Sequence, residues 1–242
     1  MRLVVVRILL LALAALLTAG MLSLLTDTPF SPALTPQLSA LYFIPVNIVC
    51  FWLLARQGRV KSLLGERPYL RGSDFGYGLL WLFALFVPFA VAINLVVLLL
   101  FGPSGYLTGF ETIFVPTTGN LLELPASVSL VFAIIVVVLF PITNAPVEEL
   151  YYRGHAQRDL AKKGMSPALV VLVPAVLFGL QHVFLAPTAA AMLVYIVAFT
   201  FWGAFAGIIY LRQGRLMPLI VAHFFTNLMT SVVPLVFILA LG

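Results

Sequence analysis

Long apolar stretches alternate with short polar segments along the whole chain. A stretch of about 18 or more apolar residues has the length of a membrane-spanning helix. Seven stretches fit this description: residues 3–25, 39–55, 76–101, 125–143, 168–186, 188–211 and 216–241. The pattern therefore predicts an all-α, polytopic bundle of seven to eight transmembrane helices.

The composition agrees with a membrane protein that carries no separate soluble domain. Of the 242 residues, 63% are hydrophobic and 9% are charged, whereas a soluble domain is about 25% charged. The net charge of +5 does not indicate nucleic-acid binding, because the basic residues lie in loops between apolar stretches. We expect one integrated membrane domain, in which residues 1–124 supply N-terminal helices and residues 125–242 supply the core with the candidate chemistry.

Apart from Arg2 and Arg7 near the N-terminus, lysine and arginine lie in alternate loops. Five lie in residues 56–75, four in 153–163 and two in 212–215. The intervening loops contain none, and their charged residues are Asp27, Glu111 and Glu123. Cytoplasmic loops of membrane proteins carry an excess of basic residues. The pattern predicts a cytoplasmic N-terminus, in a bacterial inner membrane or the endoplasmic reticulum.

The first apolar stretch allows a second interpretation. Arg2 and Arg7 precede an apolar run that ends near small residues, which is the pattern of a secretory signal peptide. The loop that follows lies on the non-cytoplasmic side of the membrane in either case, so the predicted topology of the remaining stretches is unchanged.

Two carboxylates follow the fourth apolar stretch. Ionisable groups within membrane segments are costly, so each one suggests a function. Glu149 and Arg153 are four residues apart, which places them on one helix face where they can pair. Glu148 points about 100° away and has no partner in its own segment. This unpaired carboxylate is the stronger catalytic candidate.

Two later stretches add further polar groups. His182 lies in an otherwise apolar segment, beside Gln181. His223 and Asn227 are four residues apart and therefore project from one face of the last predicted helix. Three helices that each deliver polar groups indicate a shared polar chamber inside the membrane, although a single histidine can also simply bond a neighbouring helix.

The rise per residue of an α-helix predicts how deep each candidate residue lies in the membrane, and this constrains the shared chamber. If one helix runs from Glu148 to a turn at Gly164, then Glu148 and His182 lie at the same depth, about 25 Å from that turn at 1.5 Å per residue. His223 then lies shallower, at about 13 Å from its own turn. We therefore expect the hairpin to protrude from the membrane or the helices to be tilted or broken.

Other residues have simpler interpretations. We expect His155, in a basic segment, to be solvated. Gly203 and Gly207 form a G-x-x-x-G pair, which favours close helix packing.

The four polar candidates can support peptide hydrolysis. A glutamate such as Glu148 can act as a general base toward water, and His182 can share that water. His223 and Asn227 can donate hydrogen bonds to an oxyanion. The same Glu148, His182 and His223 could instead be the three protein ligands of a catalytic zinc. The sequence leaves these two mechanisms open.

Other intramembrane protease chemistries lack their motifs. The chain has no H-E-x-x-H zinc motif and no aspartate inside a predicted span. Residues 102–105 read G-P-S-G, which matches the G-x-S-G of rhomboid proteases, but a Pro-Ser-Gly string at the end of a span is typical of a turn.

Three motifs in order resemble the CAAX prenyl endopeptidase and bacteriocin-processing family of membrane proteases, also called CPBP or Abi proteins. They are E-E-x-x-x-R at residues 148–153, F-x-x-x-H at 178–182 and H-x-x-x-N at 223–227. The resemblance covers residues 125–230 and implies a helical fold, commonly of eight spans, with a polar chamber. It implies that Glu148 and His182 activate water and that His223 and Asn227 bind the oxyanion, while Glu149 and Arg153 hold the site together.

The resulting hypothesis is an intramembrane endopeptidase. Its partners would be membrane lipid and a membrane-tethered peptide or protein substrate, including prenylated CAAX-type substrates. The main alternative is a non-catalytic membrane scaffold or a bacteriocin self-immunity protein. A transporter with polar groups at the membrane midplane is a further alternative.

Overall fold

Long apolar helices dominate the computed structural model, which describes residues 1–25, 30–31, 34–65, 69–114 and 125–241. In this part of the chain, seven helices are long and apolar enough to cross a membrane, and no strand occurs. The predicted all-α bundle is therefore confirmed, with the predicted number of spans. Asp27, Arg67 and Glu123, which entered the topology argument, lie outside the described residues.

The described residues form a series of helices of very different lengths. In chain order they are α1 (Arg2–Leu25), α2 (Pro36–Arg56), α3 (Arg59–Leu64), α4 (Gly72–Phe101), α5 (Tyr106–Phe114), α6 (Ala126–Glu149), the π-helical segment η2 (Leu150–Gln157), α7 (Arg158–Lys162), α8 (Pro167–Gln181), the 3-10 segment η3 (His182–Leu185), α9 (Ala189–Gln213) and α10 (Met217–Leu241).

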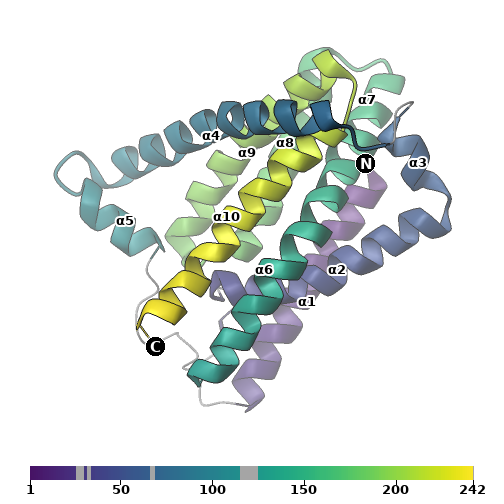
Figure 1. The fold of residues 1–242 in the computed structure, drawn as a ribbon. Coiled ribbons are helices and arrows are strands. Elements are labelled where there is room, and N and C mark those ends of the chain that lie inside the picture. The colour runs from purple at the N-terminus through teal and green to yellow at the C-terminus, as the bar shows by residue number, and fades with distance from the viewer. Residues whose placement is uncertain (26–29, 32–33, 66–68, 115–124, 242) are drawn as a thin grey trace.

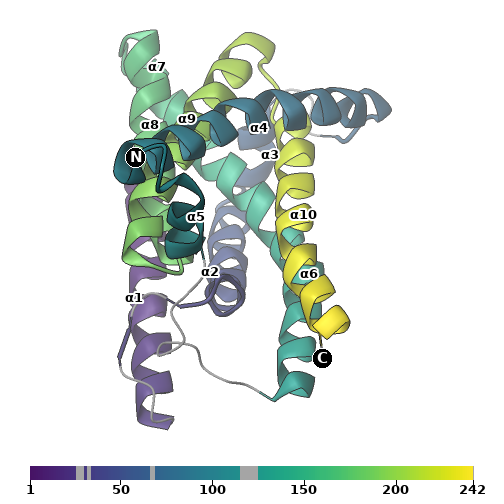
Figure 2. The same ribbon diagram turned by 90° about the vertical axis from the view of Figure 1, so that its left-hand side faces the viewer.

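The bundle is built from neighbouring long helices with one helix laid across them. α10 packs on α6, α9 packs on α8, and α2 packs on both α1 and α6. α4 crosses the bundle at a steep angle (Figures 1 and 2) and packs on α9 and α10. Its first turn is tied to the α9–α10 turn by Arg215, whose Nη2 lies 2.6 Å from Oδ1 of Asp74. The first half of α4 thus lies against α10, the helix that carries His223 and Asn227.

The helix that carries Glu148 extends far beyond the predicted end at residue 143. α6, η2 and α7 form one continuous helical stretch, and its apolar span Ser127–Lys162 has 36 residues. Pro141 and Pro146 are accommodated inside α6, because tertiary packing on α2 and α10 outweighs the local cost of proline. At 1.5 Å per residue the stretch is about 54 Å long, against a hydrocarbon core of about 30 Å. A stretch of this length either extends past the core or crosses it at a steep tilt, which are two of the arrangements expected from the sequence.

Two glycines make the turns that return the chain toward the site. Gly164 (φ 73°) lies between α7 and α8, and Gly214 (φ 67°) ends α9 before α10. Positive φ is readily accessible only to glycine. α8 then ends at Gln181, so His182 begins the 3-10 segment η3 and does not lie within a continuous helix. The expected break in helical geometry occurs at a candidate residue.

The G-x-x-x-G pair of α9 forms the predicted close contact. A Cβ on Gly203 would lie 3.1 Å from Cα of Ala175 in α8, and one on Gly207 would lie 3.2 Å from Cγ1 of Val171. The carbonyl groups of both glycines accept hydrogen bonds from η2, from Arg153 (3.0 Å) and Gln157 (2.8 Å) respectively. Close packing of α8 and α9 therefore also fixes η2.

Candidate active site

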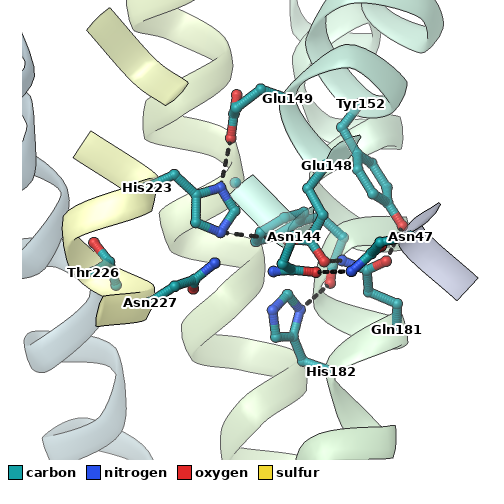
Figure 3. A network of polar contacts seen from close by, with 12 residues as sticks. Asn47, Asn144, Glu148, Glu149, Tyr152, Gln181, His182, His223, Thr226 and Asn227 are labelled. Carbon is teal, nitrogen blue, oxygen red and sulfur yellow. Dashed lines mark hydrogen bonds and ion pairs between the residues drawn. The ribbon is translucent and has the colours of Figure 1, made fainter. Parts of the chain in front are cut away.

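Glu149 lies at the end of α6 with its side chain fully buried. Its Oε1 atom accepts a hydrogen bond from Nη1 of Arg153 at 3.1 Å and lies 2.9 Å from Nδ1 of His223. The predicted pair of Glu149 and Arg153 is therefore present. Figure 3 shows that the carboxylate also reaches the histidine of α10.

Arg153 is enclosed by aromatic rings on the side away from Glu149. Its Cζ atom lies 4.7 Å from the centroid of Phe178 and 5.2 Å from that of Trp202. A guanidinium over an aromatic face is attracted by the ring quadrupole. These contacts, with the Gly203 carbonyl, hold the Glu149–Arg153 pair in one geometry.

Glu148 is also fully buried, and it has a partner that the local sequence does not provide. Nη2 of Arg7, in α1, lies 2.9 Å from Oε1 of Glu148, and Nε2 of Gln181 donates to the same oxygen at 2.9 Å. The expectation of an unpaired Glu148 is therefore wrong. The other oxygen, Oε2, lies 3.4 Å from Nε2 of His223 and has no hydrogen-bond partner among the described residues.

The sequence argument considered Arg7 only as part of a possible signal peptide. Its guanidinium also donates to the side-chain oxygens of Gln181, Asn47 (2.8 Å) and Asn144 (3.3 Å). The sequence could have identified Arg7 as a functional residue, because it lies inside the predicted stretch 3–25 and charges within such stretches indicate function.

His182 has one ring nitrogen committed to the backbone. Nδ1 lies 2.6 Å from the carbonyl oxygen of Phe178. A carbonyl only accepts, so Nδ1 carries the hydrogen, and in the neutral ring Nε2 is an acceptor. The ring stacks on Phe199 of α9, with centroids 3.5 Å apart and planes inclined by 11°. His182 thus presents a proton-accepting nitrogen at a fixed position.

Asn227 completes the group from α10. Its side chain is buried, and Nδ2 has no hydrogen-bond partner within the described part of the chain. Figure 3 shows His182, His223 and Asn227 pointing toward one another beside Glu148. The structure therefore brings the four predicted candidates together from α6, η3 and α10. Their catalytic roles stay predictions.

A cavity of about 560 Å³ reaches this group. His182, Asn227 and Asn144 line it, and most of its other walls are apolar. They include Leu82, Phe83, Phe86 and Phe89 of α4, Val136 and Phe140 of α6, and Met229 and Val233 of α10. Phe83 and Val233 are exposed on the outer surface of the bundle. The predicted polar chamber is thus a polar end of a largely apolar cavity that reaches the lipid-facing surface.

The three candidate zinc ligands contact other groups of the protein through Nδ1 or Oε1, which leaves Nε2 of each histidine and Oε2 of Glu148 as the atoms that could bind a ligand. Within the described ranges, no group of three or more His, Cys, Asp or Glu side chains is arranged to hold a metal ion. Nδ1 of His182 is engaged by a carbonyl, Nδ1 of His223 faces Glu149, and Oε1 of Glu148 already receives two donors. Glu148, His182 and His223 therefore form a hydrogen-bonded cluster here.

His155 differs from its expected solvated state. It lies in η2, is half-buried, and its Nδ1 lies 2.9 Å from Nη2 of Arg59. The contact ties α3 to the C-terminal part of the long helical stretch, and His155 is not part of the Glu148 cluster.

One segment of the chain matches a known family. Residues 128–229 match the family model described as type II CAAX prenyl endopeptidase Rce1-like. This segment is an Rce1-like domain. The Rce1-like domain includes all six predicted site residues, whereas Arg7 and Asn47 lie outside it. No curated protein and no solved structure matches the chain significantly. With seven apolar helices of spanning length among its described residues, the chain is an integral membrane protein that carries this Rce1-like domain.

Proposed function

We propose that this protein is an intramembrane endopeptidase that hydrolyses a peptide bond through water activated by Glu148 and His182. The observation that supports this proposal is the position of two buried polar atoms that lack hydrogen-bond partners. Oε2 of Glu148 and Nδ2 of Asn227 are buried without hydrogen-bond partners among the described residues, and they belong to the group at the polar end of the apolar cavity. Unsatisfied buried polar atoms are costly, so they suggest a site that water or substrate completes.

Water activation requires a proton acceptor with a free lone pair. Oε1 of Glu148 is occupied by Arg7 and Gln181, which leaves Oε2 for water. Nε2 of His182 is a second acceptor, because its Nδ1 carries the hydrogen. In the first step a water proton passes to Glu148, and the oxygen lone pair forms a bond to the substrate carbonyl carbon.

The oxyanion needs donors aimed at the carbonyl oxygen. As the new bond forms, the C=O π electrons move to oxygen, and Nδ2 of Asn227 is a suitable donor. His223 contributes when both ring nitrogens carry hydrogen, because Nδ1 then bonds Glu149 and Nε2 points to the Glu148 side of the site. The tetrahedral intermediate is thereby stabilised in a low-dielectric environment.

Collapse of the intermediate completes the reaction. The C=O bond forms again, the C–N bond breaks, and the proton held by Glu148 passes to the departing nitrogen. The products are a carboxylic acid and an amine, so one water is consumed for each peptide bond and the side chains return to their starting state.

The cavity supports a substrate with an apolar anchor. Its walls are mostly aromatic and aliphatic, and they extend from the surface of the bundle to His182 and Asn227. A membrane-tethered peptide with a prenylated cysteine near its C-terminus would place its lipid chain along these walls and the peptide bond that follows the cysteine at the polar end. The family description, a CAAX prenyl endopeptidase, favours this substrate class.

The test is cleavage of prenylated and unmodified peptides by the purified protein in liposomes, beside the Glu148→Gln variant. Glu111→Gln is the matched control, because Glu111 is exposed on α5 away from the cavity. We expect cleavage by the wild type and by Glu111→Gln, and loss of cleavage in Glu148→Gln. The absence of cleavage by folded wild type across the panel would instead support a scaffold or immunity role.

A further inference from the structure

The two buried carboxylates of the site are each paired with a different guanidinium. Glu149 pairs with Arg153 four residues along the same helical stretch, at 3.1 Å. Glu148 pairs with Arg7, 141 residues away in sequence, at 2.9 Å. All four side chains are at most 2% exposed, so water screens neither pair. Arg7 is therefore the charge that compensates the proposed general base.

The guanidinium of Arg7 is held by amide groups from three other helices. It donates to Asn47 of α2, Asn144 of α6 and Gln181 of α8. Nδ2 of Asn47 also donates to Asn144 at 3.0 Å, and the Tyr152 hydroxyl donates to Gln181 at 2.7 Å. Side chains locked by such second contacts have few alternative positions. The arrangement fixes the direction of the guanidinium as well as its charge.

The two oxygens of Glu148 have different surroundings as a result. Oε1 receives both Nη2 of Arg7 and Nε2 of Gln181, and Gln181 is itself bonded to Nη1 of Arg7. The planar fork of an arginine can hold two such groups at once, which the single nitrogen of a lysine cannot do in the same geometry. Oε2 is left toward His223, at 3.4 Å from Nε2.

We propose that Arg7 is a positioning residue of the active site, which holds Oε1 of Glu148 through its fork and so directs Oε2 toward the reacting water. The inference rests on the proposed peptidase function. It makes α1, which lies outside the Rce1-like domain at residues 128–229, a component of the active site.

A merely structural role for Arg7 would give different results. An anchor that only attaches α1 to the bundle would change the amount and thermal stability of folded protein, and the folded fraction would keep normal turnover. A positioning residue changes kcat of the folded fraction while KM stays the same, because Arg7 does not line the cavity that would receive the substrate.

The experiment compares Arg7→Gln, Arg7→Lys and Arg2→Gln in liposomes with a prenylated peptide. Arg2→Gln is the matched control, since Arg2 is exposed on the same helix. We expect kcat to fall about 100-fold in Arg7→Gln and about tenfold in Arg7→Lys, with KM unchanged, because a small misplacement of a reacting group has effects of this order. Arg2→Gln should match the wild type. Folded Arg7→Gln with kcat within twofold of the wild type would overturn the inference.

Two further arms keep the test decisive. If Arg7→Gln does not fold, the kcat of Arg7→Lys is the deciding measurement, and a value within twofold of the wild type overturns the positioning role.

The melting temperatures of Arg7→Gln, Glu148→Gln and the double variant test the ion pair without any measurement of activity. The double variant should melt above Arg7→Gln, since it removes both buried charges. Failure of wild-type cleavage would refute the peptidase function, and a double variant no more stable than Arg7→Gln would refute the pairing itself.

Discussion

Glu149 at the end of α6 contacts His223 of α10 through one carboxylate oxygen. Oε1 of Glu149 lies 2.9 Å from Nδ1 of His223, so α10 is attached to the junction of α6 and η2. The contact orients the imidazole, because the partner of one ring nitrogen sets the direction and protonation of the other. Nε2 of His223 consequently faces Oε2 of Glu148 at 3.4 Å.

Replacement of Glu149 by glutamine should lower kcat more than it changes KM. The amide removes the negative charge beside Nδ1 of His223 and leaves the buried guanidinium of Arg153 without its counter-ion. Second contacts of this kind typically contribute about 10–100-fold to activity. Turnover by the folded fraction, isolated by size exclusion, is the measurement. A Glu149→Gln protein with wild-type kcat would show that the orientation of His223 is unimportant.

Metal chelation should leave peptide cleavage unchanged. The proposed reaction uses Glu148, His182 and water, and no group of three or more His, Cys, Asp or Glu side chains within the described residues is arranged to hold a metal ion. The check is the cleavage rate in liposomes before and after treatment with EDTA or 1,10-phenanthroline, compared with the same treatment of a known zinc peptidase. Loss of cleavage that added zinc restores would contradict this prediction and return the zinc mechanism.

Narrowing of the cavity should weaken the binding of lipidated substrates selectively. Thr230 lines the cavity from an exposed position on α10, so Thr230→Trp adds bulk there without filling a packed core. We expect a higher KM for a prenylated peptide and a smaller change for an unmodified one. Thr112→Trp is the control, because Thr112 is also exposed but lies on α5 outside the cavity. Equal effects of both variants would argue against lipid binding in this cavity.

The number of spans and the group of four candidates could be predicted because both depend on local pattern. Apolar length defines a membrane span, and Glu148, His182, His223 and Asn227 are polar residues in or beside apolar stretches. Four-residue spacing also placed Glu149 beside Arg153, because helix geometry alone decides that contact.

Long-range pairing and helix continuity could not be obtained in the same way. The partner of Glu148 is Arg7 from the first helix, and no local rule joins residues 141 positions apart. The fourth helix continues past Pro141 and Pro146 because its neighbours support it, whereas local propensity predicts an end. Arg7 is buried inside the bundle. A basic residue near the end of a predicted span can therefore belong to a site in the interior and need not only set the topology.

Substitution of Gly179 by alanine should reduce both stability and turnover. A Cβ at this position of α8 would lie 2.2 Å from Oγ1 of Thr200 and 2.4 Å from the carbonyl oxygen of Ile196, so α8 and α9 must separate. Overpacking of this kind costs about 1–3 kcal/mol. His182 follows three residues later and stacks on Phe199 of α9, so the separation should also displace its ring.

The control for this substitution is Gly76→Ala in α4. A Cβ on Gly76 meets nothing within 4 Å, and alanine is favoured over glycine in a helix by about 1 kcal/mol. We expect Gly76→Ala to melt at or above the wild-type temperature and to cleave normally, whereas Gly179→Ala should melt lower with reduced kcat. A Gly179→Ala protein with the melting temperature and kcat of the wild type would contradict this prediction. It would show that α8 and α9 can repack around the added methyl group and that their close contact does not position His182.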